Sequence, residues 1–381
     1  MQEASIKNRS LEYLSGLTET QLISLVTKLQ WPSFKAQQIH SWIYKKCISS
    51  IDEMTDLSVK DRDFLNKNYK LSPLELTQKQ ISEDKTIKYL WKLNGGNQVE
   101  SVRMFLEDHD SYSACISSQV GCAVGCPFCA TGKIGFKRNL KAAEIVDQIL
   151  GIQKDTKERI SNVVFMGQGE PLLNYDEVLT AMNLIKDSVG IGARHITLST
   201  SGIVPNIKKL ADEKLQITLA ISLHAPDQRT REILVPISKK YPISELMESL
   251  HYYYEKTKRR ITIEYVMLDG INDQIEKAKE LSDLIKGLHC HINLIPYNPI
   301  EHSEIKGQRS EIRIQDSHLP SPISDLCLKR PPRKRIYNFK DVLEKRSGKK
   351  VTVRKERGVD IAAACGQLAN IFNKNLEKGQ E

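Results

Sequence analysis

Between residues 113 and 296 the sequence alternates short β-like runs with amphipathic helical stretches. The β-like runs fall at residues 113–118, 162–166, 195–199, 216–223, 260–268 and 291–296. The helical stretches between them fall at residues 141–154, 175–188, 204–213, 243–257 and 274–287. Repeated strand–helix units of this length predict a parallel sheet. We therefore predict an α/β fold, a full or partial TIM-type (βα) barrel with its functional residues at the carboxyl ends of the strands.

The regions that flank this repeat have other patterns. Thr18 and Gln21 have the spacing of a capping box and predict the start of a helix. Further short helices are expected at residues 34–48 and 59–68, and β-like runs at 86–93 and 98–106. The predicted parts are an N-terminal helical accessory domain at 1–80, a core at 81–369 and a tail at 370–381. Residues 301–345 are basic and lose the periodicity, which predicts an insertion in the core, read as a long loop as far as about residue 335 and then a helix from 337.

Eight cysteines raise the question of the compartment. The first ten residues, MQEASIKNRS, contain no apolar signal segment, and no apolar run approaches 18 residues. We therefore expect a cytoplasmic protein without a membrane segment. The sequence leaves the oligomeric state open, and a monomer is the simplest expectation. In a reducing compartment, clustered cysteines more often bind metal or take part in chemistry than form disulfides.

The net charge of +9 is concentrated in one stretch. Residues 329–357 hold thirteen Lys and Arg against three Asp and Glu, a net +10, which leaves −1 for the rest of the chain. A local basic patch suits a phosphate-backbone partner. A solvated charged segment without a partner is the competing interpretation.

Three cysteines, Cys122, Cys126 and Cys129, follow the first strand of the repeat with the spacing C-x3-C-x2-C. A structural zinc site needs a fourth ligand, and no second CxxC or HxxxH motif is present to supply it. Three thiolates on one short loop suit a [4Fe-4S] cluster whose fourth iron is open. Such an iron can bind S-adenosylmethionine (SAM), and the cluster can supply the electron that releases a 5′-deoxyadenosyl radical.

The same region carries a family resemblance. The segment SSQVGCAVGCPFCATGKIGFKRNL (117–140) resembles the RlmN family of dual-specificity radical-SAM RNA adenine-carbon-2 methyltransferases. Further matching segments are FMGQGEPLLNYDEV (165–178), ITLSTSGIVP (196–205), AISLHAPDQ (220–228), ITIEYVMLDGIND (261–273), INLIPYNP (292–299) and VRKERGVDIAAACGQLA (353–369). Three departures from the family pattern are the insertion at 301–345, Ala362 in place of an acid, and Gln168 in place of Met.

The resemblance implies a set of SAM-binding residues. These are Gly169, Glu170, Ser199, Ser222, Leu223, His224 and Asn298, each near a predicted strand end. Gly167 and Gly169 would let the backbone approach a ligand closely, and Glu170 could accept a hydrogen bond from the SAM ammonium. Taken alone, a GxG turn is a weak signal and His224 would more often be structural.

The resemblance also implies a methyl carrier. Carbon 2 of adenine is electron-poor and will not attack the methyl group of SAM, so a thiolate can take the methyl first and a radical from a second SAM can then activate it. Cys365 matches the family's methyl-carrying cysteine, Cys115 the resolving cysteine that forms a transient disulfide, and Glu100 the proton acceptor. Without that context Cys365 and Cys115 would be buried structural residues and Glu100 a solvated one. Cys47, Cys290 and Cys327 are interpreted as structural or incidental.

The partners follow from the same resemblance. It implies 23S rRNA and some tRNAs as substrates, the latter at the adenine beside the anticodon, with the base flipped out of its stack. A flavodoxin-type electron donor is expected, and the basic patch and N-terminal helices would hold phosphates. Three alternatives stay open: a sister-family enzyme that methylates carbon 8, a non-catalytic zinc-bound RNA-binding protein, and a radical enzyme acting on a peptide or small metabolite.

Overall fold

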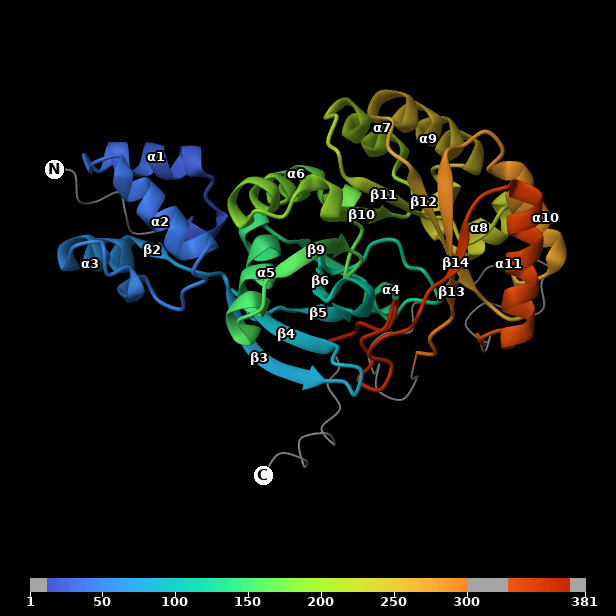
Figure 1. The fold of residues 1–381 in the computed structure, drawn as a ribbon, viewed down its shortest axis with the longest axis horizontal. Helices are drawn as coiled ribbons and strands as arrows, with labels where there is room; N and C mark the ends of the chain where they lie inside the picture. The colour runs from blue at the N-terminus through green and yellow to red at the C-terminus, as the bar shows by residue number, and fades with distance from the viewer. Residues whose placement is uncertain (1–11, 301–327, 371–381) are drawn as a thin grey trace.

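A computed structural model describes residues 12–300 and 328–370, and its centre is a ten-stranded sheet with the order β14-β13-β12-β11-β10-β9-β6-β5-β4-β3 (Figure 1). The parallel strands are β6 (Ser111–Cys115), β9 (Ile160–Phe165), β10 (Ile196–Thr200), β11 (Thr218–Ser222), β12 (Ile261–Met267), β13 (Cys290–Pro296) and β14 (Val351–Val353). The crossover helices include α5 (Ala142–Thr156), α6 (Tyr175–Leu184), α7 (Val204–Asp212), α9 (Ile243–Thr257), α10 (Ile275–Leu284) and α11 (Arg333–Ser347). The predicted α/β partial barrel is therefore confirmed.

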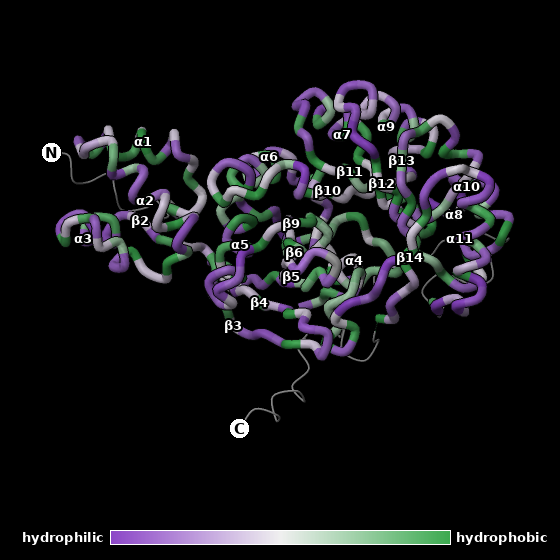
Figure 2. Tube along the Cα trace, viewed as in Figure 1, coloured by the Kyte–Doolittle hydropathy of each residue, from purple (hydrophilic) through white to green (hydrophobic). Residues whose placement is uncertain are grey.

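The parallel sheet curves, and the crossover helices form an arc around its outer side (Figure 1). Figure 2 shows hydrophobic residues gathered along the strands and hydrophilic residues on the outer helices. In β12, six of the seven side chains are buried, as expected for a strand covered on both faces. A short helix that the sequence did not predict, α8 (Gln228–Leu234), follows β11. Among the described residues no helix has the length and apolarity to cross a bilayer.

Three antiparallel strands extend the sheet beyond β6. They are β3 (Leu74–Ile81), β4 (Ile87–Leu93) and β5 (Gln98–Leu106). The runs predicted at 86–93 and 98–106 are β4 and β5. The edge strand β3 was not predicted, and it begins within the range assigned to the accessory domain. Its sequence LELTQKQI alternates apolar and polar residues only from Leu74 to Thr77, too short a pattern to indicate a strand, and its side chains are exposed or half-buried throughout.

The N-terminal domain packs beside the barrel at the end of the sheet where α5 lies (Figure 1). Its helices are α1 (Glu19–Lys28), α2 (Phe34–Tyr44) and α3 (Val59–Asn68), and the strands β1 (Glu12–Tyr13) and β2 (Tyr69–Lys70) pair beside them. The capping box of Thr18 and Gln21 is present, as predicted. Gly16 meets α5 so closely that a Cβ there would lie 2.7 Å from the Cβ of Ala143.

The basic region before β14 shortens the predicted loop at its C-terminal end. Residues 301–327 lie outside the described part of the chain, but α11 begins at Arg333, four residues before the expected start of the last helix. Pro332 occupies its N-cap and ends the irregular segment, and proline is compatible with a helix start because no backbone donor is lost there. Since α11 connects β13 to β14 and packs on α10, it is a crossover helix of the barrel.

Candidate functional site

A small hairpin frames the loop that carries the three clustered cysteines. It pairs β7 (Gln119–Gly121) with β8 (Phe136–Asn139). Gly121 has φ +73°, and a Cβ there would lie 1.7 Å from the carbonyl oxygen of Gly135, so only glycine fits. Cys122 N–H donates to that same oxygen at 3.1 Å, and Cys129 N–H donates to the Cys126 carbonyl at 3.1 Å. The short helix α4 (Ala130–Ile134) starts directly after Cys129.

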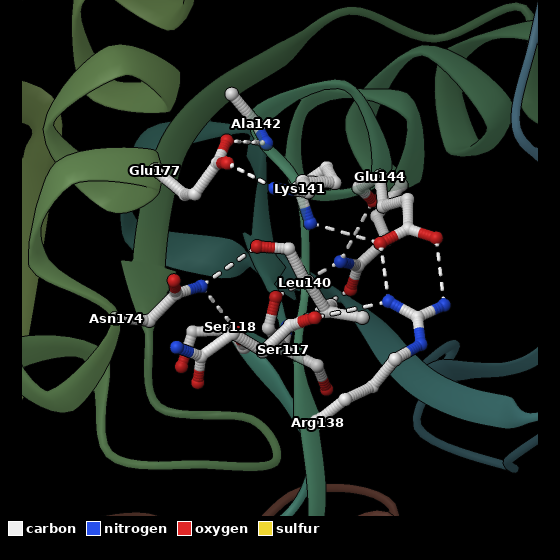
Figure 3. A network of polar contacts seen from close by, with 11 residues as sticks. Ser117, Ser118, Arg138, Leu140, Lys141, Ala142, Glu144, Asn174 and Glu177 are labelled. Atoms are coloured by element: carbon white, nitrogen blue, oxygen red, sulfur yellow. Dashed lines mark hydrogen bonds and ion pairs between the residues drawn. The ribbon is translucent and has the colours of Figure 1, made fainter. Parts of the chain in front are cut away.

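A polar network fixes this hairpin to the barrel (Figure 3). Arg138 on β8 forms two 2.8 Å hydrogen bonds with the Glu144 carboxylate at the start of α5. Glu144 also accepts from Lys141 N–H, while Glu177 on α6 accepts from Ala142 N–H, both at 2.8 Å. The hairpin and the two helices are therefore held in one arrangement behind the cysteine loop.

Cys122, Cys126 and Cys129 all line one cavity of about 170 Å³ (the first cavity). Within residues 12–300 and 328–370, no three His, Cys, Asp or Glu side chains meet closely enough to hold a single metal ion. A [4Fe-4S] cluster does not require the three sulfur atoms to converge on one metal position, because each cysteine binds a different iron. Burial raises the pKa of Cys122 to about 12 and also raises the pKa values of the other two thiols. Buried thiols of this kind become thiolates when bound iron supplies positive charge, so the donor set fits the cluster.

Six of the seven residues implied for SAM binding line the first cavity with the cysteines. They are Gly169, Glu170, Ser199, Ser222, His224 and Asn298. The seventh, Leu223, is fully buried behind the cavity wall, and its N–H donates to the Glu264 carbonyl at 3.0 Å. The residues come from four different strand ends, as barrel geometry requires.

Glu170 and His224 are both held by backbone groups. One oxygen of Glu170 accepts from Ser201 N–H and its hydroxyl, each at 2.7 Å, and the other accepts from Leu172 N–H at 2.9 Å. His224 Nδ1 accepts from Val266 N–H at 3.0 Å, and burial lowers the pKa of His224 to about 3. The imidazole is therefore neutral, and its other nitrogen carries a proton.

A second cavity of about 370 Å³ lies on the other side of Cys365 (the second cavity). Cys365 lines both cavities, whereas Cys115 lines only the second and the three clustered cysteines line only the first. The loop of Cys365 is tied to the cluster loop, because Ala130 N–H donates to the Gly366 carbonyl at 2.7 Å. Asn298 donates to the Cys365 carbonyl at 3.2 Å. Cys47 and Cys290 line neither cavity, and Cys327 lies outside the described residues.

Glu100 on β5 lines neither cavity and is fully buried. One of its oxygens lies 3.6 Å from the ammonium of Lys88, which is also buried, and the other accepts from Asn370 N–H at 2.9 Å. Burial raises the pKa of Glu100, and Lys88 opposes this shift. Gln168, one of the three departures, accepts a hydrogen bond from Glu100 N–H at 3.2 Å. Ala362, another departure, adopts φ +50° in the Cys365 loop.

Arg354 is a site residue that sequence reasoning missed. It directly follows β14, is half-buried and lines both cavities. Its guanidinium donates to the Met166 sulfur at 3.5 Å and lies 4.0 Å from Glu264. The negative charge of a Cys365 thiolate, followed by Glu264 and Cys115, raises the pKa of Arg354. The sequence counted Arg354 among the surface cations, but its position at a strand end was a signal for a place in the site.

Comparisons with known proteins agree with this architecture. The Radical SAM superfamily model matches residues 116–282, and the model of the ribosomal RNA large subunit methyltransferase N-terminal domain matches residues 13–71. A crystal structure of a radical SAM methyltransferase from Sphaerobacter thermophilus superposes with a TM-score of 0.85 and 39% identity, covering 94% of this chain and all of that one. The fold and the site therefore define a radical SAM methyltransferase, a class that uses a [4Fe-4S] cluster and SAM.

Two curated relatives narrow this class. Proteins from Alkaliphilus oremlandii and Staphylococcus aureus strain MW2 are each named probable dual-specificity RNA methyltransferase RlmN. The first is 46% identical over 93% of this chain and 96% of its own length, and the second 45% identical over 88% and 86%. The chain belongs to the RlmN family.

Proposed function

We propose that this protein methylates carbon 2 of an adenine in RNA, with Cys365 as the methyl carrier. The observation that supports this most is the position of Cys365 on the wall common to both cavities, with Cys115 lining only the second. A carrier must meet the methyl donor on one side and the acceptor on the other. The proposed substrates are 23S rRNA and the adenine beside the anticodon of some tRNAs, met in the cytoplasm.

In the proposed reaction the Cys365 thiolate first takes a methyl group from SAM held in the first cavity. Cys122, Cys126 and Cys129 would hold the cluster, which, once reduced by a flavodoxin-type donor, would supply the electron for cleavage of a second SAM. The radical released by that cleavage would then take a hydrogen atom from the S-methyl group on Cys365. The methylene carbon on Cys365 then bonds to carbon 2 of the adenine. Arg354, which lines both cavities, orients the thiols with its positive charge.

Release of the product needs a base and a second thiol. Glu100 is proposed to accept the proton from carbon 2, and its raised pKa makes it a stronger base than an exposed carboxylate. Because Glu100 is fully buried and lines neither cavity, this role requires RNA binding to bring the carboxylate within reach of the base. The adduct radical would also have to return one electron to the oxidised cluster. Cys115 then attacks the Cys365 sulfur, so that an S–S bond forms, the bond from sulfur to the methylene carbon breaks, and that carbon takes up a proton to become the methyl group of the freed base. Burial raises the pKa of Cys115 to about 12, so a nearby cation such as Arg354 is needed to favour its thiolate.

Nucleoside analysis tests the proposal. Protein reconstituted with iron and sulfide without oxygen is given SAM, reductant and RNA, and the digested RNA is examined by mass spectrometry. We expect 2-methyladenosine, and none from Cys365→Ala. Formation of 8-methyladenosine would assign the protein to carbon-8 chemistry. SAM cleavage without RNA methylation would point to a peptide or metabolite substrate, and a bound zinc ion without SAM cleavage to a non-catalytic RNA-binding protein.

A further inference from the structure

Arg231, in the middle of the short helix α8, is fully buried. A buried guanidinium is costly unless its donors are bonded and its charge is compensated. Nη2 of Arg231 donates to the Ser201 carbonyl at 2.6 Å. Its Nε and Nη1 atoms are buried without a hydrogen-bond partner, and no carboxylate in residues 12–300 and 328–370 forms an ion pair with it. Two free donors on a buried cation indicate that Arg231 serves a negatively charged group.

The helix that carries Arg231 packs against the cysteine loop. Leu234 at the end of α8 and the adjacent Val235 share one apolar cluster with Val124, and Cys126 packs against this cluster. A Cys126 thiolate would raise the pKa of Arg231, and the guanidinium in turn lowers the pKa of Cys126. Burial lowers the pKa of Arg231 only to about 10, so the side chain stays charged at neutral pH. Arg231 therefore places a positive charge near Cys126, outside the wall of the first cavity.

The other charges around the three clustered thiols do not supply this compensation. Glu170 is a buried carboxylate that raises the pKa values of two of the thiols. Lys133 lies near the third thiol but is exposed, so solvent screens its charge. Arg354 lines the first cavity, but Glu264 lies 4.0 Å from it and offsets its charge. Reduction of a cluster at this site adds an electron beside thiolates and a carboxylate, and Arg231 is a buried cation placed to oppose that cost.

We propose that Arg231 raises the reduction potential of the cluster, with its buried charge and its free Nε–H and Nη1–H groups stabilising the reduced form through the sulfur of Cys126. Positive charge and hydrogen bonds at the sulfur ligands are among the factors that set such potentials. Arg231 lines neither cavity, so it acts as a positioning residue and not as a catalytic one. The inference rests on the cluster site of the proposed function and is independent of the RNA substrate and of the carbon atom that is methylated.

Redox titration of the reconstituted full-length protein tests the inference. Arg231→Met removes the charge, Arg231→Lys keeps it, and Lys133→Met is the control that removes an exposed charge near the same loop. Each protein is titrated without oxygen, and the reduced cluster is followed by electron paramagnetic resonance. SAM and RNA are left out, so a changed potential cannot come from altered substrate binding.

We expect Arg231→Met to shift the reduction equilibrium toward the oxidised cluster by about tenfold or more, which is a potential at least about 59 mV more negative. Arg231→Lys and Lys133→Met should each stay within about threefold of wild type. An unchanged potential in Arg231→Met overturns the inference. So does a shift as large in Arg231→Lys as in Arg231→Met, because the charge would then not be its cause.

A measurement on the wild-type protein covers the case in which Arg231→Met fails to fold or to hold a cluster. Protein with isotopically labelled arginine guanidinium nitrogens is reduced and examined by electron–nuclear double resonance. We expect a coupling between the cluster spin and a labelled nitrogen that persists in Arg354→Lys. Absence of the coupling in wild type, or its loss in Arg354→Lys, overturns the inference. Wild-type protein that shows the coupling but methylates no RNA overturns the proposed function alone.

Discussion

The two cavities that meet at Cys365 are made differently. The first is formed by loops at the carboxyl ends of parallel strands and by the Cys365 loop, and is lined by four thiols and two buried carboxylates. The second is formed by strand faces and the C-terminal segment and is lined mainly by apolar and cationic groups. The comparison teaches that one cysteine can react with both a methyl donor and a methyl acceptor when the donor and the acceptor occupy separate cavities with different linings. The methyl group crosses this wall on sulfur, so the two halves of the reaction should be separable by mutation.

The largest expected effect comes from the cysteines on either side of the wall. Cys115→Ala should lower RNA methylation on the order of a thousandfold, because the bridge to the base cannot be cut. It should keep S-methylation of Cys365, since Cys115 does not line the first cavity. Cys122→Ala should lose both half-reactions. Tryptic peptides carrying methylated Cys365 and nucleoside analysis measure the two, and Cys115→Ala protein without methylated Cys365 would contradict the separation.

The next effect concerns a buried pair that lies outside both cavities. Lys88→Met leaves Glu100 as an unpaired buried carboxylate, so the free energy of unfolding should fall by about 3–5 kcal/mol. Lys92→Met on the same strand is the matched control, because its ion pair with Glu75 is exposed and should contribute no measurable stability. Guanidinium denaturation compares the two, and equal effects would show that the buried pair does not form.

A third effect tests a region remote from the wall. Asp147 on α5 bonds to Ser72 in the segment before β3, and burial raises the pKa of Asp147 from 3.8 to about 6. Because the folded pKa lies above the unfolded one, the stability from this group is present below about pH 4 and is lost as the pH rises through about 6. The loss should be about 3 kcal/mol. Unfolding measured between about pH 4 and pH 8 should show a smaller decline in Asp147→Asn.

The control for that experiment is Asp63→Asn, an exposed aspartate on α3. It should follow the wild-type pH dependence. Cys365 methylation and RNA methylation should change together, if at all, in Asp147→Asn, because the residue lines neither cavity. If Asp147→Asn lost only one of the two half-reactions, this would contradict the view that only residues lining a cavity can affect one half-reaction without the other.

The smallest effect concerns RNA contacts outside the second cavity. The basic patch is partly neutralised, since Arg335 pairs with Asp273 at 2.7 Å and with Asp269. Arg333 and Lys334 are exposed and form no ion pair within the described residues. Replacing both with Ala should lower the salt slope of RNA affinity by about two, whereas Arg335→Ala should leave the slope unchanged and lower stability. Equal slopes in the two proteins would contradict this division of the patch.

Most of the functional residues that line the first cavity could be predicted from the sequence because they belong to short local motifs. The cysteine spacing and the segment from Gly167 to Glu170 follow buried strands, and the structure puts these residues around one cavity. Their positions are local: each lies in a loop whose shape is set by a glycine such as Gly121. The order of strands and crossover helices was predictable for the same reason, because each unit has its own periodicity.

The second cavity could not be read in this way. Its wall is formed by Val102, Val164 and Thr197, which lie on three strands and have no spacing in common. Arg354 and Lys355 are adjacent in the sequence, yet one lies between the cavities and the other pairs with exposed Glu107. Counting the charges in the sequence does not distinguish Arg354 from Lys355, because tertiary packing decides which of the two side chains is buried. The edge strand β3 was missed for a similar reason, since it packs too few side chains to show a pattern.

Isotope transfer tests the passage of the methyl group through Cys365 most directly. The protein is first methylated with SAM carrying a trideuterated methyl group, freed of SAM, and then given RNA, reductant and unlabelled SAM. We expect the first methyladenosine formed to carry two deuterium atoms, because the carbon comes from Cys365 and has lost one hydrogen isotope. A first product with an unlabelled methyl group would contradict a carrier at the wall between the two cavities.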